Sequence, residues 1–185
     1  MGSKPNVVIR SANSTDLPYL ENIRKSAFVP VFSSFRKILG DEIYNLAQAH
    51  EDEAQGDFLA SLLEPDSDWK VYTAAIDSTV VGFVSFQLNL DRKVGEIGLN
   101  AVDPNHSGRG IGTIMYNFAI AKMKEVGMQV ATVATGGDPS HAPARRAYEK
   151  AGFTVQIPSV WLCQNFKCGR PRIGHFVLGT SATAS

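Results

Sequence analysis

The chain has 185 residues, 18 basic and 18 acidic side chains, and a hydrophobic fraction of 44%. This length suits one domain with a substantial core, and this composition is that of an ordinary globular protein rather than a disordered one. The zero formal charge argues against a general attraction to nucleic acid or to an anionic membrane, so any anion site has to be local.

The N-terminal third predicts one strand followed by a long helical region. Residues 7–12 read as a short strand, and their apolar stretch is too short for a signal peptide. Turn and cap residues at 13–16 end this strand. Residues 17–63 carry a helical pattern that we expect to be broken twice, at Pro30 and at Gly40.

The rest of the chain predicts a strand meander followed by alternating helices and strands. Three closely spaced strands at 69–76, 79–90 and 94–102 favour antiparallel pairing, because parallel neighbours need a long crossover. No apolar run reaches the roughly 20 residues that span a bilayer. The later expected elements are an amphipathic helix ending at Gly127, a strand at 128–135, a helix at 140–151, a strand at 153–161 and a final strand at 174–180.

This order predicts an α/β fold with a mixed, mostly antiparallel central sheet of six or seven strands flanked by helices. We expect a single domain over residues 1–180, with 181–185 as a frayed tail. The two cysteines, Cys163 and Cys168, lack a second pair or nearby histidines, and the other histidines lack metal-ligand spacing. The expectation is therefore a cytoplasmic protein with reduced thiols and no metal site.

Three glycines at alternate positions, Gly108, Gly110 and Gly112, precede the amphipathic helix. A Walker A loop needs a following Lys-Ser or Lys-Thr, and a dinucleotide fingerprint needs another spacing within a parallel unit, so both are set aside. Free N–H groups at a helix N-terminus can still bind phosphate oxygens, and Arg109 can add a charge-assisted contact. The segment alone is equally compatible with a plain turn that starts a helix.

Two segments in combination resemble a known family. EIGLNAVDPNHSGRGIGTIMY, followed some thirty residues later by HAPARRAYEKAGF, resembles the GNAT superfamily of N-acetyltransferases over about residues 7–160. The first segment is similar to the pattern [Q/R]-x-x-G-x-[G/A], which binds the pyrophosphate of acetyl-CoA, and Gly110 and Gly112 match its small residues. The second is similar to N-x-x-A-x-x-x-Y-x-x-x-G-F, matched by Ala144, Tyr148, Gly152 and Phe153.

The sequence departs from the family at two of these positions. Ser107 stands where the family usually has Gln or Arg, so one charged phosphate contact is in doubt. His141 stands where the family usually has Asn, and its reach towards the pantetheine arm or the substrate differs.

The resemblance implies acetyl-CoA as cosubstrate and a cofactor-binding core at about residues 94–153. The acetyl-pantetheine arm would pair with the strand that ends at Val102, where backbone N–H groups near Asn100 and Val102 would polarise the thioester carbonyl. The residues implied to bind the cofactor are Asn100, Ala101, Val102, Ser107, Gly108, Arg109, Gly110, Ile111, Gly112, Thr113, His141 and Ala144.

Acetyl transfer to an amine also needs a base and an acid. Glu96 is the candidate base, because it matches the catalytic glutamate of histone-acetylating GNATs and would share a face with Gly98 and Asn100 on a regular pleat. Desolvation in an otherwise apolar strand would favour this role, whereas a solvent-facing Glu96 would leave the proton to ordered water. Tyr148 is the candidate acid for the leaving thiolate; the alternative is a tyrosine that only fills the core.

We therefore expect an acetyl-CoA-dependent N-acetyltransferase that acts by direct transfer on a primary amine. A small molecule is the preferred acceptor, because the sequence shows no basic or extended acidic surface and no appended module for a large partner. The alternatives are a protein lysine or N-terminal acetyltransferase and a non-catalytic acyl-CoA-binding regulatory module. Assembly as a homodimer stays open.

Overall fold

The computed structural model describes residues 6–166, whose centre is a twisted five-stranded sheet. The strands lie in chain order across the sheet, the first four antiparallel and the last parallel to its neighbour. They are β1 (Val8–Ser11), β2 (Lys70–Ile76), β3 (Thr79–Asn89), β4 (Val94–Val102) and β5 (Val130–Val133). The predicted meander at 69–102 is confirmed.

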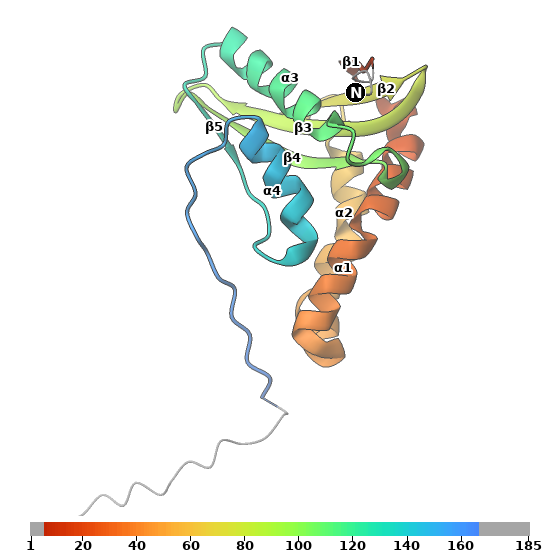
Figure 1. Cartoon of the computed structure of the whole chain (residues 1–185), viewed down its shortest axis with the longest axis vertical. Helices are drawn as coiled ribbons and strands as arrows, with labels where there is room; N and C mark the ends of the chain where they lie inside the picture. Colours follow the sequence, from red (N-terminus) through yellow and green to blue (C-terminus); the bar gives the residue numbers. More distant parts are fainter. Residues whose placement is uncertain (1–5, 167–185) are drawn as a thin grey trace, which may run out of the picture.

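The predicted count of six or seven strands is wrong for the described residues, which form five. Residues 153–161 follow the last helix without forming a strand, and Figure 1 shows this segment running away from the sheet. Val155 and Ile157 are 92% and 91% exposed, and Pro158 has no N–H to give to a ladder. A strand-like composition without a face to bury it therefore does not make a strand here. The strand expected at 174–180 and the tail at 181–185 lie outside the described residues.

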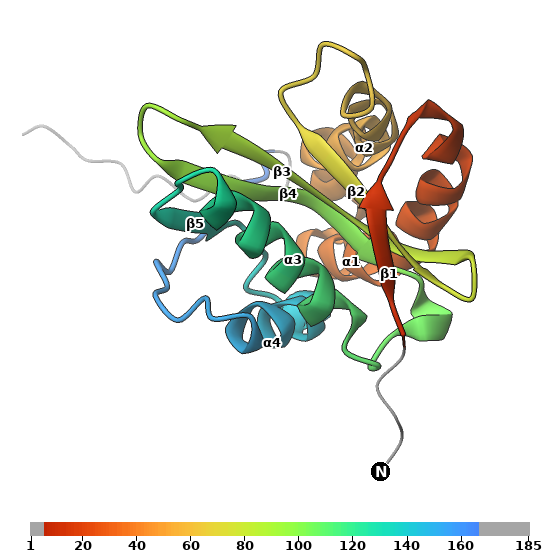
Figure 2. The same ribbon diagram turned by 90° about the horizontal axis from the view of Figure 1, so that it is seen from above.

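Four helices cover the two faces of the sheet. The helices α1 (Leu17–Ala47) and α2 (Ala49–Ser61) lie on one side, and α3 (Ile111–Glu125) and α4 (Ala142–Lys150) lie on the other, as Figure 2 shows from above. Short 3-10 turns precede three of them: η1 (Ser14–Asp16), η2 (Pro104–His106) and η3 (Pro139–His141). Within residues 6–166 no helix has the length and apolarity to cross a membrane.

The long helical region is interrupted at Gly40 and again at Gln48, between α1 and α2, but not at Pro30. Gly40 takes a left-handed φ of 72°, a conformation that favours glycine, and this kink divides α1. Pro30 was expected to break the helix as well, but it lies inside α1. Both Pro30 and Ser26, whose carbonyl loses its helical donor, are exposed, so water can satisfy that carbonyl.

Each face of the sheet has its own apolar core. The core beneath α3 and α4 is built around Phe86, Ile97 and Met115, and the core beneath α1 and α2 around Leu20, Leu59 and Phe83. All six side chains are at most 2% exposed. Burial on two faces explains why the sheet strands carry long apolar runs rather than a clean alternation.

Candidate active site

An extra residue in β4 changes which face of the sheet its side chains occupy. Val84 of β3 pairs with Asn100, but Phe86, two residues further along β3, pairs with Ile97, three residues back along β4. This is a β-bulge at Gly98 and Leu99, and such a bulge reverses the pleat beyond it. The expectation that Glu96 and Asn100 share a face on a regular pleat is therefore wrong.

Beyond the bulge, one edge of β4 has no strand beside it in the described structure. β5 pairs with β4 only from Val94 to Ile97, while β4 continues to Val102. The N–H of Asp103 bonds to Val81 of β3 at 2.9 Å. In an antiparallel ladder the bonded residues alternate, so the N–H groups of Asn100 and Val102 point away from β3, towards the β5 side. Two backbone donors are thus available where the two strands separate.

The side chain of Asn100 joins two tyrosines beneath this edge. Its amide nitrogen donates to the hydroxyl of Tyr148 at 3.0 Å and to the carbonyl of Gly98 at 2.8 Å. Its amide oxygen accepts from the hydroxyl of Tyr116 at 2.7 Å. The two phenol rings stack with centroids 4.4 Å apart, and both tyrosines are buried. Three elements, β4, α3 and α4, are held together by this one amide.

Both phenols are protonated at neutral pH. Burial raises the pKa of Tyr116 well above its ordinary value, and the neighbouring Tyr148 raises it further. Burial also raises the pKa of Tyr148, although hydrogen bonds from Asn100 and Tyr116 act in the opposite direction. The amide of Asn100 donates to the Tyr148 oxygen and would also stabilise the phenolate that forms if Tyr148 gave up its proton.

The glycine segment forms the turn between β4 and α3. Gly108 and Gly110 have left-handed φ values of 74° and 81°, which any other residue adopts only with strain. A Cβ at either position would meet no atom within 4 Å, so the loop borders open space. Gly112 differs, because it lies in the first turn of α3, where a Cβ would contact Ala147 and Tyr116 at 3.7 Å.

The N-terminus of α3 has no side-chain cap. Gly110 is the N-cap residue, and the first intrahelical bond runs from the N–H of Ile114 to its carbonyl. The N–H groups of Ile111, Gly112 and Thr113 have no intrahelical partner at a helix start. Arg109, beside them, is exposed and has no hydrogen bond or ion pair among residues 6–166. Backbone donors of this kind, next to a cationic residue in the sequence, are the groups that can bind an anion at a helix N-terminus.

The remaining cofactor residues predicted from the sequence fall on both sides of this turn. Ala101 is buried in the core beneath α1 and α2, so only its backbone faces the strand edge. Ser107 is exposed at the end of η2, and Ala144 lies on the first turn of α4. His141 is the residue immediately before α4 and contacts α1 through Phe35, with ring centroids 5.7 Å apart.

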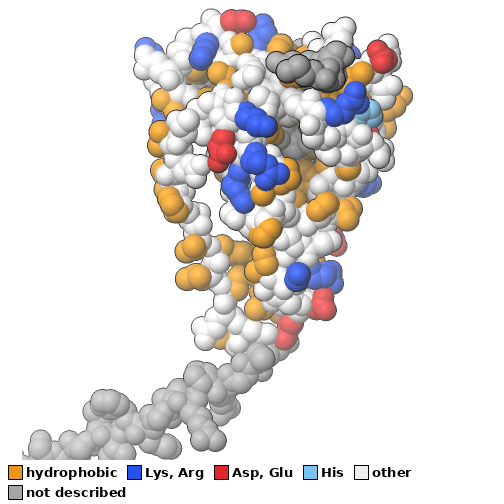
Figure 3. All heavy atoms as spheres, viewed as in Figure 1, with side chains coloured by type: hydrophobic (Ala, Val, Ile, Leu, Met, Phe, Trp, Pro, Cys, Tyr) orange, Lys and Arg blue, Asp and Glu red, His pale blue; other side chains and the backbone are white. Residues whose placement is uncertain are grey.

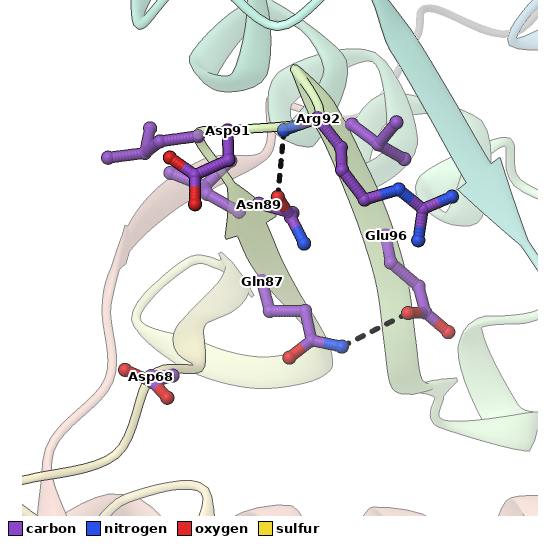
Figure 4. A pocket seen from close by; sticks show the side chains of 9 residues that line it. Asp68, Gln87, Asn89, Asp91, Arg92 and Glu96 are labelled. Atoms are coloured by element: carbon purple, nitrogen blue, oxygen red, sulfur yellow. Dashed lines mark hydrogen bonds between the residues drawn. The ribbon is translucent and has the colours of Figure 1, made fainter.

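Glu96 lies apart from the Asn100 amide. Its side chain is exposed, so the expected desolvation of the carboxylate is absent, and Gln87 donates to it at 3.0 Å. It lines a surface hollow at the β3–β4 hairpin, drawn in Figure 4, together with Asp68, Asp91 and Arg92. Four residues of strand, about 13 Å at 3.3 Å per residue, separate it from Asn100 along β4.

The sequence did not single out Tyr116, the side chain of Asn100 as a bridge, or Asp138 of the β5–α4 loop. Tyr116 falls at core spacing on α3, so its pattern signals burial and not its hydroxyl bond. A polar Asn in an otherwise apolar strand was a usable signal, because buried amides need partners. Within the described residues, no cluster of His, Cys, Asp and Glu has the arrangement of a metal site.

Comparison with known proteins gives a family match over most of the chain. The model of the acetyltransferase (GNAT) family matches residues 32–153. A mycothiol acetyltransferase from Sanguibacter keddieii is 34% identical over 106 residues, which are 54% of this chain and 33% of that protein. The chain thus spans about a third of the length of this curated relative.

Solved structures of low sequence identity share the fold. PaiA N-acetyltransferase from Thermoplasma acidophilum, in complex with coenzyme A, has a TM-score of 0.65 at 18% identity, covering 83% of this chain and 93% of that one. An aminoglycoside acetyltransferase from an uncultured soil metagenomic sample, in complex with sisomicin, has a TM-score of 0.53 at 19% identity, covering 87% and 97%.

Proposed function

Because the chain belongs to the acetyltransferase (GNAT) family, we propose that it transfers the acetyl group of acetyl-CoA directly to the primary amine of a small molecule. Acetyl-CoA is the acyl donor of this family and supplies an acetyl group activated as a thioester. The observation that carries the proposal is the separation of β4 from β5 beside a tyrosine hydroxyl. Two free backbone donors and one phenol meet there.

The described residues fit a CoA thioester. Gly108 and Gly110 leave the loop surface open, and the uncapped N–H groups of α3 with Arg109 can receive the pyrophosphate. The N–H groups of Asn100 and Val102 are assigned to the pantetheine arm and to the developing oxyanion. Ser107 contributes its hydroxyl and backbone to the phosphate end.

Tyr148 is assigned the role of acid for the leaving thiolate. Its phenol holds its proton at neutral pH, and the amide of Asn100 donates to its oxygen and so stabilises the charge that develops when the proton leaves. The base is a separate question. Glu96 stays the prediction from the sequence, although its exposed position far along β4 does not favour it.

A small amine is the preferred acceptor class. The chain has zero formal charge. A groove of about 870 Å³ between α1 and α2 is lined by Glu21, Asp52, Glu53 and Asp57 as well as by Arg24, Lys25 and Arg36. This is a local mixed-charge groove and not an extended surface for a macromolecule. The mycothiol and aminoglycoside acetyltransferases of the comparison also have small-molecule names, whereas a lysine or N-terminal amine of a protein is the second candidate.

The test is release of CoA thiol with a panel of amines. We expect acetyl-CoA to raise the melting temperature and at least one small primary amine to drive thiol release. Turnover with peptides alone would favour the protein-acetylating alternative. Stabilisation by acetyl-CoA without thiol release across both panels would favour a binding module, and the absence of any stabilisation by acyl-CoA would refute the proposal.

A further inference from the structure

The loop between β5 and α4 contains a histidine–carboxylate pair. The Nδ1 atom of His141 lies 2.5 Å from Oδ1 of Asp138. The other carboxylate oxygen accepts from the hydroxyl of Ser34 on α1 at 2.7 Å and from the N–H and hydroxyl of Ser140 at 3.0 and 2.5 Å. The carboxylate is therefore fixed by donors from two elements as well as by the imidazole.

Asp138 is ionised at neutral pH. Burial would raise its pKa, but hydrogen bonds from Ser140, Ser34 and His141 outweigh burial and hold the pKa well below its usual value. A charged carboxylate accepts only, so the proton between the two side chains belongs to Nδ1. With the proton on Nδ1, the basic lone pair of the imidazole is on Nε2.

The Nε2 atom is available to a ligand. It has no hydrogen bond among the described residues. Nδ1 of His106 also lacks a hydrogen bond, but that atom is buried, whereas Nε2 of His141 is not among the buried unpartnered atoms. The other edge of the ring is enclosed, because a Cβ on Gly136 would lie 2.5 Å from Nδ1. The side chain is 18% exposed, so the ring is held on one edge and open on the other.

The position of His141 connects the acetyl-transfer region with α1. It immediately precedes α4, and Tyr148 follows seven residues later, about two helical turns or 10 Å along the helix axis. The Tyr148 side chain leans towards the helix N-terminus and shortens this gap. The neighbours of His141 on α1, Ser34 and Phe35, are uncharged, and the charged groups beside it are Asp138 and Arg145, whose guanidinium donates to the carbonyls of Gly136 and Asp138.

We propose that His141, oriented by Asp138, is the base that removes the proton from the acceptor amine. The inference rests on the proposed acetyl transfer and names a residue role within it. Nε2 takes one proton from the ammonium form of the acceptor. The freed electron pair forms the N–C bond at the acetyl carbon as the C–S bond breaks and its pair leaves on sulfur. Tyr148 protonates the thiolate and regains the proton that the new amide nitrogen loses, and His141 returns its proton to solvent.

This role explains a departure from the family pattern. An Asn at position 141 can hydrogen-bond but has no basic atom to accept a proton, whereas the imidazole of a histidine has one. It also supplies a base at the N-terminus of α4, whereas Glu96 is exposed and distant along β4. The arrangement of a carboxylate on Nδ1 and a free Nε2 is that of an oriented general base.

The experiment compares H141A, H141N and D138N with H50A, which removes an exposed histidine of α2 as a matched control. Acetyl-CoA binding by calorimetry and melting temperature establish that each variant is folded and binds the cosubstrate. For H141A and H141N we expect kcat to fall about 10²-fold or more at neutral pH, loss of the acidic limb of the pH–rate profile, and a much smaller change in the KM for acetyl-CoA than in kcat. Free imidazole should restore part of the rate to H141A, and H50A should match the wild type.

A second readout does not depend on activity. Long-range ¹H–¹⁵N spectra of the wild-type protein should show a protonated Nδ1 and an unprotonated Nε2 at His141, and D138N should lose this tautomer preference. Any of three results would overturn the proposal. H141N could keep the wild-type rate, or the acidic limb of the pH–rate profile could persist in H141A and disappear in E96Q. The third such result is a wild-type His141 that is protonated on Nε2. Wild-type protein that releases no thiol with any amine would instead refute the proposed function itself.

Discussion

Replacing Asn100 with Ala should destabilise the protein through the two tyrosines that its side chain joins. The amide makes three hydrogen bonds, to Tyr116 at 2.7 Å, to Gly98 at 2.8 Å and to Tyr148 at 3.0 Å. Tyr116 and Tyr148 are 3% and 6% exposed, so water cannot readily replace the lost partner. At about 1 kcal/mol for each bond, N100A should lower the free energy of unfolding by about 2–4 kcal/mol.

A double-mutant cycle isolates the part of this loss that belongs to the Tyr116 bond. Y116F removes the hydroxyl that donates to Asn100, and alone it should cost about 1 kcal/mol. In N100A the Tyr116 hydroxyl is already unpartnered, so removing it as well should cost little or nothing. The loss in N100A/Y116F should therefore be about 1 kcal/mol smaller than the sum of the two single losses.

Urea unfolding followed by circular dichroism measures these differences. N117A is the matched control, because Asn117 is an exposed asparagine on α3, and its effect should stay within about 0.5 kcal/mol. A loss below about 1 kcal/mol in N100A, or single losses that add to within about 0.3 kcal/mol in the double variant, would refute the idea that this amide joins the three elements.

Three further predictions concern the glycines before and within α3, the acid role of Tyr148 and the carboxylate of Asp138. G110A should lower the free energy of unfolding by about 1–2 kcal/mol, since φ is 81° there. G112A lies within a helix and should raise the free energy of unfolding by about 0.5–1 kcal/mol. Both substitutions should weaken acetyl-CoA binding in calorimetry. Y148F should slow acetyl transfer in single-turnover assays without loss of acetyl-CoA binding, and an unchanged chemical step would exclude the acid role. The folded-state pKa of Asp138 is lowered, so the stability that its ionised carboxylate contributes is complete above the unfolded-state pKa of about 4 and is lost as the pH falls. Between pH 7 and pH 3 the free energy of unfolding, measured by urea unfolding, should therefore fall by about 1 kcal/mol more in the wild type than in D138N.

The family and the order of the main elements could be predicted from the sequence. Short connections between residues 69 and 102 permit only antiparallel neighbours, and the meander formed as expected. The turn at Gly108 and Gly110 before α3 followed from local backbone preferences, which short-range sequence determines. The two GNAT-like segments agree with the family match over residues 32–153.

Several expectations failed because exposure or burial in the folded chain decides the outcome. Pro30 was read as a break, but exposure of the freed Ser26 carbonyl lets α1 continue. Residues 153–161 have a strand-like composition, but beyond Phe153, which packs against Tyr148, their side chains are exposed. The local sequence pattern indicates which secondary structure a segment can form, whereas burial against other elements determines which one it does form.

The candidate site shows the same division between sequence and tertiary structure. The sequence by itself determined which chemical groups are present: the glycines, Tyr148 and an asparagine in an apolar strand. Only the tertiary structure decided which of them meet. The bulge at Gly98 turns Asn100 onto the face of Tyr148 and away from that of Glu96, because a single extra residue in one strand reverses the side chains beyond it, and a sequence read alone does not reveal the register of its partner strand.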